Sequence, residues 1–322
     1  MRTGKLDNEV LNDLILKKYR HIRSEVKGSP MIGMDCAAVD LGGRLAVLST
    51  DPITAADKNI GRLTVNISCN DAAAAGAEPI GMLVTLLAPP SITPEELGSI
   101  ADELAEAAVD ANIDIIGGHT EITESVTRVV TSATVIAKSL TEKSLASAKL
   151  HRGDSIVMTK SAGMEGAAIV ASDFADRLGD ALTAEEVEYA KSFVRRISVV
   201  KEGIYAALNG ANAMHDITEG GVFGAIWEMA QGAGCGVVVD VDAIPVEDVT
   251  RKICAATGLD VYKLISSGSM LIACPDGDAM VEGLRENGID AAVIGKAEGN
   301  EIITKDNRPI LPPQSDEIYK LF

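Results

Sequence analysis

The chain has 322 residues, 47% hydrophobic and only 3% aromatic, and its 47 acidic against 29 basic side chains leave a formal net charge of -18. Because nucleic acids are bound by clustered Lys and Arg and by aromatic platforms, this composition argues against a nucleic-acid partner. A polyphosphate ligand would need metal ions to bridge the like charges. The length favours two domains of roughly 150 residues each.

The five cysteines are scattered, without a C-x-x-C pair, which argues against a disulfide framework or a zinc knuckle. The first residues, "MRTGKLDNEVLNDLILKKYRHIR", carry charges throughout, and no later segment reaches about 18 consecutive apolar residues. We therefore expect a soluble, cytoplasmic protein with no membrane segment.

Helical and extended segments alternate along the whole chain. Apolar, β-branched runs predict strands at 45–51, 81–87, 127–137, 155–160, 236–241, 270–275 and 291–297. Thr93 with Glu96, and Thr183 with Glu186, have the spacing of capping boxes and predict two helix starts. The first of these helices leads into a short strand at 113–116 that Gly117 and Gly118 should end.

A polar, aperiodic segment, "KSLTEKSLASAKLHRGDS", separates the third and fourth predicted strands. We place the domain boundary there, giving domains 1–145 and 146–322. Both halves mix helices and strands, so the predicted fold class is α/β (α+β).

In the stretch "SCNDAAAAGAEP", two polar residues precede a run of small ones. Asn70 and Asp71 are good N-caps and alanine is the best helix former, so the stretch predicts a capped helix start. The small side chains would let another backbone or a ligand come close. Two roles for Asp71 stay open at this point: a helix cap and a cation ligand.

Acidic residues stand beside small ones in three further places: Asp35 in "GMDCAAVD", Asp51 in "LSTDPIT", and Glu121 next to His119 in "GGHTEIT". Each aspartate alone is a common cap or turn residue. Together with Asp71 they match a hard-cation site, since Mg²⁺ binds through one or two carboxylates plus substrate phosphates.

Two stretches of the second half are further candidates. "TKSAGMEGAA" runs from a strand through Gly163 and Gly166 into a helix, so it is either an anion-binding turn or an ordinary strand-to-helix turn. In "MHDITEGGVFGAIWEMA", Asp216, Thr218 and Glu219 precede a glycine pair and a helix. They are either a helix entry or a carboxylate pair that reaches the substrate.

The ordered motifs "GMDCAAV", "STD", "VNISCNDAAAAGAEP", "GGHTEIT", "DITEGGVFGAIWEMA" and "SSGSMLIA" resemble those of the aminoimidazole ribonucleotide (AIR) synthetase-like superfamily. Its members include that purine enzyme, thiamine-monophosphate kinase, selenophosphate synthetase and the hydrogenase maturation protein E type, and the likeness covers nearly the whole chain. The resemblance is closest to the hydrogenase-maturation-like branch.

The resemblance implies a two-domain fold whose N-terminal strands form a barrel across a homodimer, with ATP and Mg²⁺ near that interface and a protein partner as a further possibility. It implies metal ligation by Asp35, Asp51 and Asp71, and catalytic roles for His119, Asp216 and Glu219. The implied cofactor-binding residues are Gly33, Asn70, Gly117, Gly118, Thr120 and Thr218. Gly163 and Gly166 join them as cofactor-binding candidates from the glycine turn described above, independently of the resemblance.

The chain departs from each well-known member of that superfamily. The hydrogenase maturation proteins end in a cysteine, whereas here the last cysteine is Cys274 and the sequence closes "DEIYKLF". Selenophosphate synthetases use a cysteine or selenocysteine in the N-terminal segment, whereas this chain has no cysteine before Cys36. We expect an ATP-using, Mg²⁺-dependent enzyme that phosphorylates or activates an unidentified small molecule. The alternative is a nucleotide-binding assembly or regulatory protein with little catalysis.

Overall fold

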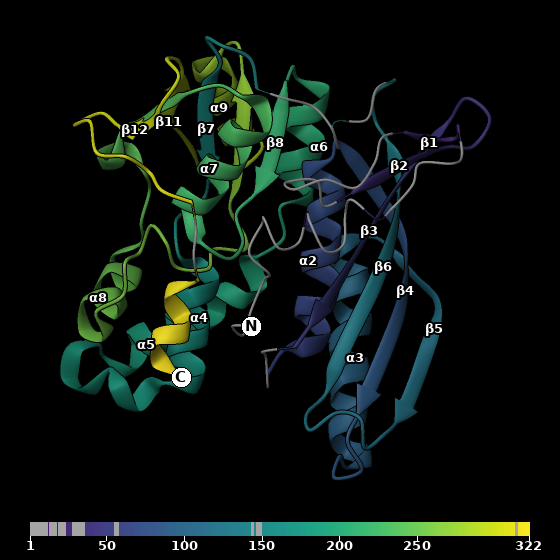
Figure 1. The fold of residues 1–322 in the computed structure, drawn as a ribbon. Coiled ribbons are helices and arrows are strands. Elements are labelled where there is room, and N and C mark those ends of the chain that lie inside the picture. Colours follow the sequence, from purple (N-terminus) through teal and green to yellow (C-terminus); the bar gives the residue numbers. More distant parts are fainter. Residues whose placement is uncertain are drawn as a thin grey trace.

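The computed structural model describes residues 12, 18, 24–27, 36–54, 58–142, 145, 150–312 and 315–322. Gly33 and Asp35, two of the predicted site residues, lie outside this set. The described residues form two six-stranded sheets, one in each half of the chain (Figure 1). None of the described helices is long and apolar enough to cross a membrane.

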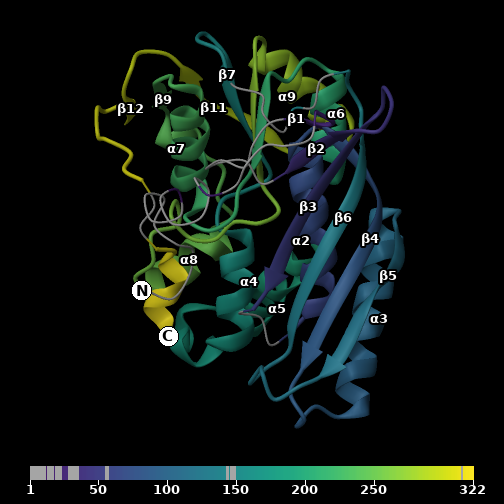
Figure 2. The same cartoon turned by 45° about the vertical axis from the view of Figure 1, so that its right-hand side comes forward.

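The N-terminal sheet has the strand order β1-β2-β3-β6-β4-β5, antiparallel except for the β4–β5 pair. Its elements in chain order are β1 (Val26–Lys27), β2 (Ala37–Asp40), β3 (Leu45–Ile53), α2 (Ile60–Ala74), β4 (Ala77–Ala88), α3 (Pro94–Ala111), β5 (Asp114–Ile122) and β6 (Val130–Ser139). Helices α2 and α3 lie on one face of this sheet, and Figure 2 shows the opposite, open face of β3, β6 and β4 toward the viewer.

The C-terminal sheet has the order β12-β9-β11-β7-β10-β8, antiparallel except for the β12–β9 pair. Its strands are β7 (Ser155–Thr159), β8 (Ala213–Asp216), β9 (Val237–Val239), β10 (Met270–Cys274), β11 (Ala291–Ala297) and β12 (Ile302–Thr304). The helices are α4 (Met164–Asp173), α5 (Ala184–Ser192), α6 (Val200–Leu208), α7 (Gly221–Ala233), α8 (Asp248–Thr257) and α9 (Gly277–Glu286), and a short 3-10 helix lies at Glu317–Leu321.

One hydrophobic core joins the two halves. Its buried side chains come from α2 and the N-terminal sheet and also from β7, β10, α6 and α9. Helices α2 and α6 cross so closely that a Cβ on Gly203 would lie 2.6 Å from the carbonyl oxygen of Ala73. The small side chains after Asp71 were expected to admit either another backbone or a ligand. In the structure they admit the backbone of α6.

Several predicted elements are confirmed. Both capping boxes are present, with the Thr93 and Thr183 side chains accepting from the backbone of Glu96 and Glu186. All seven predicted strand segments overlap strands of the two sheets. The domain boundary near residue 145 stays a prediction; it falls between the last strand of the first sheet and the first strand of the second.

Two predicted element ends are wrong. Helix α2 begins at Ile60, so Asn70 and Asp71 lie in its last turns instead of capping its start. Strand β5 does not stop at Gly117 but runs on to Ile122. Gly118 is needed inside the strand because a Cβ there would lie 1.8 Å from the carbonyl oxygen of Val84 on β4.

Candidate functional site

Asp71 is the most buried of the described metal candidates, with 6% of its surface exposed. Its Oδ2 accepts a 2.5 Å hydrogen bond from Ser49 Oγ of β3. Asp51 is half-buried and follows Ser49 by two residues, so both side chains point to the same face of the strand. That face packs on α2, and the structure therefore places Asp51 and Asp71 in one layer between β3 and α2.

Asn70 is completely buried, and protein groups engage both ends of its amide. Its Nδ2 donates to the carbonyl oxygen of Ile197 and its Oδ1 accepts from the backbone N–H of Val199, each at 2.8 Å. The residue that we predicted as a cofactor ligand thus binds the backbone of the C-terminal half.

Strand β5, the edge strand of the first sheet, carries the predicted cofactor-binding residues Gly117, Gly118 and Thr120 together with His119, and all nine of its residues are exposed. Gly118 and Thr120 stand beside the buried Val84 and Leu86, on the face covered by helices. Pairing across the sheet runs from Asp51 through Ala133 and Val84 to Gly118. Gly118 is therefore level with Asp51 but three strands away, a distance of roughly 14 Å at the usual strand spacing.

Gly117 and His119 point to the open face of the sheet, because their partners on β4 alternate with the buried positions. His119 Nε2 lies 3.4 Å from Oε2 of Glu121, and both side chains are exposed. Within one chain, the structure therefore does not bring His119 to Asp71, which lies beneath the other face.

The glycine turn before α4 is packed against protein. The N–H of Gly163 donates to Ser266 Oγ at 2.8 Å, and the N–H of Gly166 donates to the carbonyl oxygen of Ile265 at 3.0 Å. A Cβ on Gly166 would lie 2.3 Å from Leu264. Close packing accounts for both glycines, so of the two readings left open the geometry supports the ordinary strand-to-helix turn.

Lys160, just before this turn, has a largely buried side chain whose ammonium group meets three acceptors. It pairs with Glu202 at 2.6 Å and donates to the carbonyl oxygens of Arg196 and Ser198 at 3.0 and 2.6 Å. Burial lowers its pKa, while the neighbouring Glu202 raises it. Because an ammonium has three donors, this lysine has none left for a phosphate.

Asp216 ends β8 and is buried, whereas Thr218 and Glu219 in the following turn are half-buried. The turn is held from two sides: Gly220 N–H donates to Asp316 Oδ2 at 2.8 Å, and Thr218 accepts from the Ser266 N–H at 3.3 Å. Burial raises the pKa of Asp316 to about 6, and the charge of Glu219 adds to that rise.

Glu165, in the first turn of α4, is a second carboxyl of this region, with 8% of its surface exposed. Burial raises its pKa to about 7, Ser267 opposes the rise, and the charges of Glu219 and Asp316 add to it. In the described part of the chain, its Oε2 has no hydrogen-bond partner. Glu165, Glu219 and Asp316, which we call the C-terminal carboxyl cluster, thus lie within electrostatic reach of one another.

Sequence reasoning missed Glu165, Asp316 and Lys160. Glu165 had one usable signal, since a charged residue inside the small, apolar run from Gly163 to Ala168 must be buried with it. No sequence signal pointed to Asp316, because its hydrogen-bond partner, Gly220, is 96 residues away in the chain.

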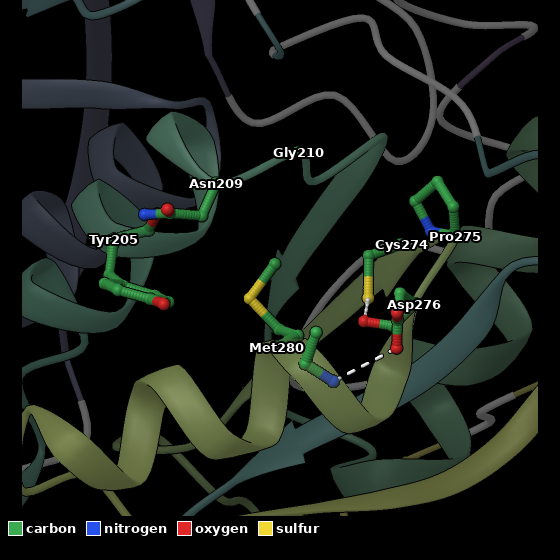
Figure 3. A pocket seen from close by; sticks show the side chains of 8 residues that line it. Tyr205, Asn209, Gly210, Cys274, Pro275, Asp276 and Met280 are labelled. Atoms are coloured by element: carbon green, nitrogen blue, oxygen red, sulfur yellow. Dashed lines mark hydrogen bonds between the residues drawn. The ribbon is translucent and has the colours of Figure 1, made fainter.

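A cavity of about 320 Å³ opens between the end of α6 and the start of α9 (Figure 3). Figure 3 shows Tyr205 and Asn209 on one side, Cys274 and Asp276 on the other, and Met280 between them. None of the predicted site residues lines it. Burial raises the pKa of the Cys274 thiol to about 11, so this thiol is not a ready nucleophile.

The carboxylates of Asp51 and Asp71 fit a magnesium ion by their chemistry, because Mg²⁺ takes hard oxygen ligands and needs only one or two from the protein when phosphates supply the rest. Among the residues that the structure describes, no group of three or more His, Cys, Asp or Glu could hold a metal ion alone. The donor set therefore fits a metal carried in with a phosphate ligand better than a closed protein site.

Two protein-family models match the chain: "AIR synthase related protein, N-terminal domain" over residues 33–138 and "AIR synthase related protein, C-terminal domain" over residues 151–305. A putative hydrogenase expression/formation protein of Methanocaldococcus jannaschii is 30% identical, covering 96% of this chain and 90% of its own. The carbamoyl dehydratase HypE of Escherichia coli is 27% identical over 76% of this chain and 72% of its own.

Solved structures share the fold. Thiamine monophosphate kinase from Aquifex aeolicus superposes with a TM-score of 0.74 at 17% identity, covering 97% of this chain and 100% of its own. A hydrogenase maturation protein HypE in complex with ATP gives a TM-score of 0.70 at 21% identity, and the match covers 98% of this chain and 97% of the HypE chain. With both halves of its fold and both family models in agreement, the chain belongs to the AIR synthase related family.

Proposed function

We propose that this protein is a Mg²⁺-dependent enzyme that uses ATP to phosphorylate, or otherwise activate, a small-molecule acceptor in the cytoplasm. The observation that carries the proposal is the buried Asp71 carboxylate, fixed by Ser49 in the same layer as Asp51. Similar proteins have been solved with ATP, or with AMPPCP and TMP. Phosphoryl transfer depends mainly on positioning and charge neutralisation, which carboxylates, glycines and a metal can supply.

In this proposal Asp51 and Asp71 hold the metal, and Asp35 remains a predicted third ligand outside the described residues. Asp216, Thr218 and Glu219 form the acceptor side. Glu219 is the half-buried member of the C-terminal carboxyl cluster, so it is the one we assign to contact with the acceptor.

We further propose that the protein works as a homodimer built on the first sheet. Strand β5 is an edge strand with every residue exposed, and an uncovered edge favours pairing with another chain. Apolar side chains gather there and on β4, with Leu83 41% and Ile116 53% exposed. His119 on the open face would then face the second copy. Replacing Ile116 with Glu should give a monomer in light scattering.

The proposal is tested by thermal unfolding with ATP plus Mg²⁺, ATP plus EDTA, and neither. At 100 times its dissociation constant, a ligand of the folded state adds about 2.7 kcal/mol of stability. We expect a metal-dependent shift in the wild type, none in D71N, and the wild-type shift in D102N, which changes an exposed aspartate of α3. No shift at millimolar ATP in the wild type would reject the proposal.

A nucleotide-binding assembly or regulatory role is the second candidate. It is favoured by the glycine turn before α4, whose two amides are taken by protein acceptors, and a similar HypE has been solved in a complex with HypF. The two candidates differ in turnover: release of more than one ADP per chain with any small metabolite would exclude the second.

A further inference from the structure

The Asn70 side chain links the two halves of the chain by hydrogen bonds. It lies on α2, immediately before Asp71, and both of its polar atoms are bonded to backbone more than 120 residues away. We call the segment that receives these bonds, Arg196 to Val199, the bridge segment. Each of the two polar atoms could form one further hydrogen bond. Because none of the side chain is exposed, neither atom is open to a nucleotide.

The bridge segment is also held from the C-terminal side. Lys160 donates to two of its carbonyl oxygens, those of Arg196 and Ser198, on either side of the Ile197 oxygen that Asn70 binds. Gly268 packs against it so closely that a Cβ would lie 2.8 Å from the Cα of Ile197. The bridge segment is therefore held in place both by α2 and by two loops of the C-terminal half.

The loop around Gly268 in turn holds the predicted acceptor-side turn. Ser269 accepts from the N–H of Ile217 at 2.9 Å, and the N–H of Ser266 donates to the carbonyl oxygen of Thr218 at 3.3 Å. Glu219 is the next residue. Each step from Asp71 to Glu219 is thus a covalent bond along the chain, a hydrogen bond of the Asn70 side chain to backbone, a backbone hydrogen bond, or the close contact at Gly268.

We propose that Asn70 is a positioning residue that sets where the Glu219 turn lies relative to Asp71, and not a ligand of the nucleotide. The inference rests on the proposed function, because only there are Asp71 and Glu219 the two halves of one site. Its physical reason is that in-line transfer tolerates little displacement between the two substrates.

The test compares N70A with N66A. Asn66 is also buried and lies one turn earlier on α2, but its side chain makes no hydrogen bond to the bridge segment among the described residues. The probe is Mg-ATP, measured by calorimetry for its Kd and by ADP release for its rate. In N70A we expect a Kd close to the wild-type value and a rate lower by about 100-fold, the effect of a misplacement of about 1 Å. N66A should keep the wild-type rate.

A second variant covers the case in which N70A does not fold. G268A pushes on the bridge segment from its other side without touching Asn70, and should produce the same unchanged Kd with a reduced rate. Two results would overturn the proposal: a Kd that rises in parallel with the loss of rate in N70A, which would make Asn70 a nucleotide ligand, or equal losses in N70A and N66A.

Hydrogen exchange tests this link between the halves without nucleotide, so its failure is separate from a failure of the proposed function. The amide of Val199 donates to Asn70, and its exchange should quicken in N70A together with that of residues 266–269. Faster exchange confined to α2 would overturn the proposal, even if the wild type binds Mg-ATP. Conversely, a wild type that binds no Mg-ATP rejects the proposed function, whatever the exchange shows.

Discussion

Ser49 Oγ donates to Asp71 Oδ2 at 2.5 Å, and this hydrogen bond ties the middle of β3 to the end of α2 in the core of the N-terminal half. A carboxylate buried there would otherwise lose its hydration without replacement. The bond holds the Asp71 side chain on the same side of the strand as Asp51, so the proposed metal ligand is held in place before any ligand arrives.

Replacing Ser49 with Ala should weaken Mg-ATP binding without abolishing it. The Asp71 carboxylate keeps its charge but loses the donor that orients it, and a hydrogen bond to a charged group contributes about 1.5–3 kcal/mol. Calorimetry of Mg-ATP binding should show a Kd higher by about tenfold, which corresponds to about 1.4 kcal/mol. Thr50→Ala is the matched control, because Thr50 lies on the opposite face of β3. Equal Kd values for S49A and wild type would remove Asp71 from the metal site.

Replacing Gly203 with Ala should destabilise the protein by about 1–3 kcal/mol, the usual effect of overpacking a core. The new Cβ would lie 2.6 Å from the backbone of Ala73, so α2 and α6 must move apart. Urea unfolding measures the change. Gly98→Ala in exposed α3 is the control, since a Cβ there meets nothing within 4 Å, and it should stabilise by about 0.5–1 kcal/mol. A neutral G203A would show that the two helices are not in close contact.

The capping boxes and strands could be predicted because their causes are local: Thr93 and Glu96 stand three residues apart, and β-branched runs suit a pleated sheet. The start of α2 could not. Its N-cap, Asn59, is left-handed and makes no side-chain cap bond, so the local signal lay at Asn70 instead. That polar pair is inside the helix because its partners are Ser49 and the bridge segment, which only the tertiary fold supplies.

The relative positions of the candidate site residues were also predictable only in part. The carboxylates near small residues were visible as a pattern, and the structure does place Asp51 and Asp71 in one layer. Which face of β5 carries His119 depends on the register with β4, and that register shifts at Met82. Since a one-residue change in register exchanges the two faces, the sequence pattern alone could not separate His119 from Thr120.

Replacing Lys160 with Met should destabilise the protein by about 3–5 kcal/mol, because Glu202 is left as an unpaired charge in the core. The double variant K160M/E202L removes that charge and should recover most of the loss. It should remain below wild type by about 1–3 kcal/mol, because the half-buried carbonyl oxygens of Arg196 and Ser198 both lose their donor.

Unfolding in urea distinguishes these cases. The control is K191M, which breaks the exposed Lys191–Glu188 pair and should change stability by less than about 1 kcal/mol. If K160M and K191M have equal effects, the Lys160–Glu202 pair is not buried as the structure places it.

The C-terminal carboxyl cluster predicts that the free energy of unfolding falls as the pH rises from about 3.8 to about 7. The folded pKa is about 7 for Glu165 and about 6 for Asp316, against ordinary values of 4.5 and 3.8. Between the ordinary and the folded value, the folded chain binds the proton and the unfolded chain does not, so the unfolding free energy decreases with rising pH. For Glu165 this decrease runs from about pH 4.5 to about pH 7 and is on the order of 3 kcal/mol.

Glu165→Gln should therefore flatten this decrease, since the amide does not ionise. We expect E165Q and wild type to be about equally stable at pH 5, and E165Q to be the more stable at pH 8, where the wild type must keep a buried charge beside Glu219 and Asp316. Glu282→Gln, at an exposed position of α9, should follow the wild-type curve at both values. Parallel curves for wild type and E165Q from pH 5 to pH 8 would mean that Glu165 is already ionised at pH 5 and has partners, such as bound water or a cation, that offset its burial.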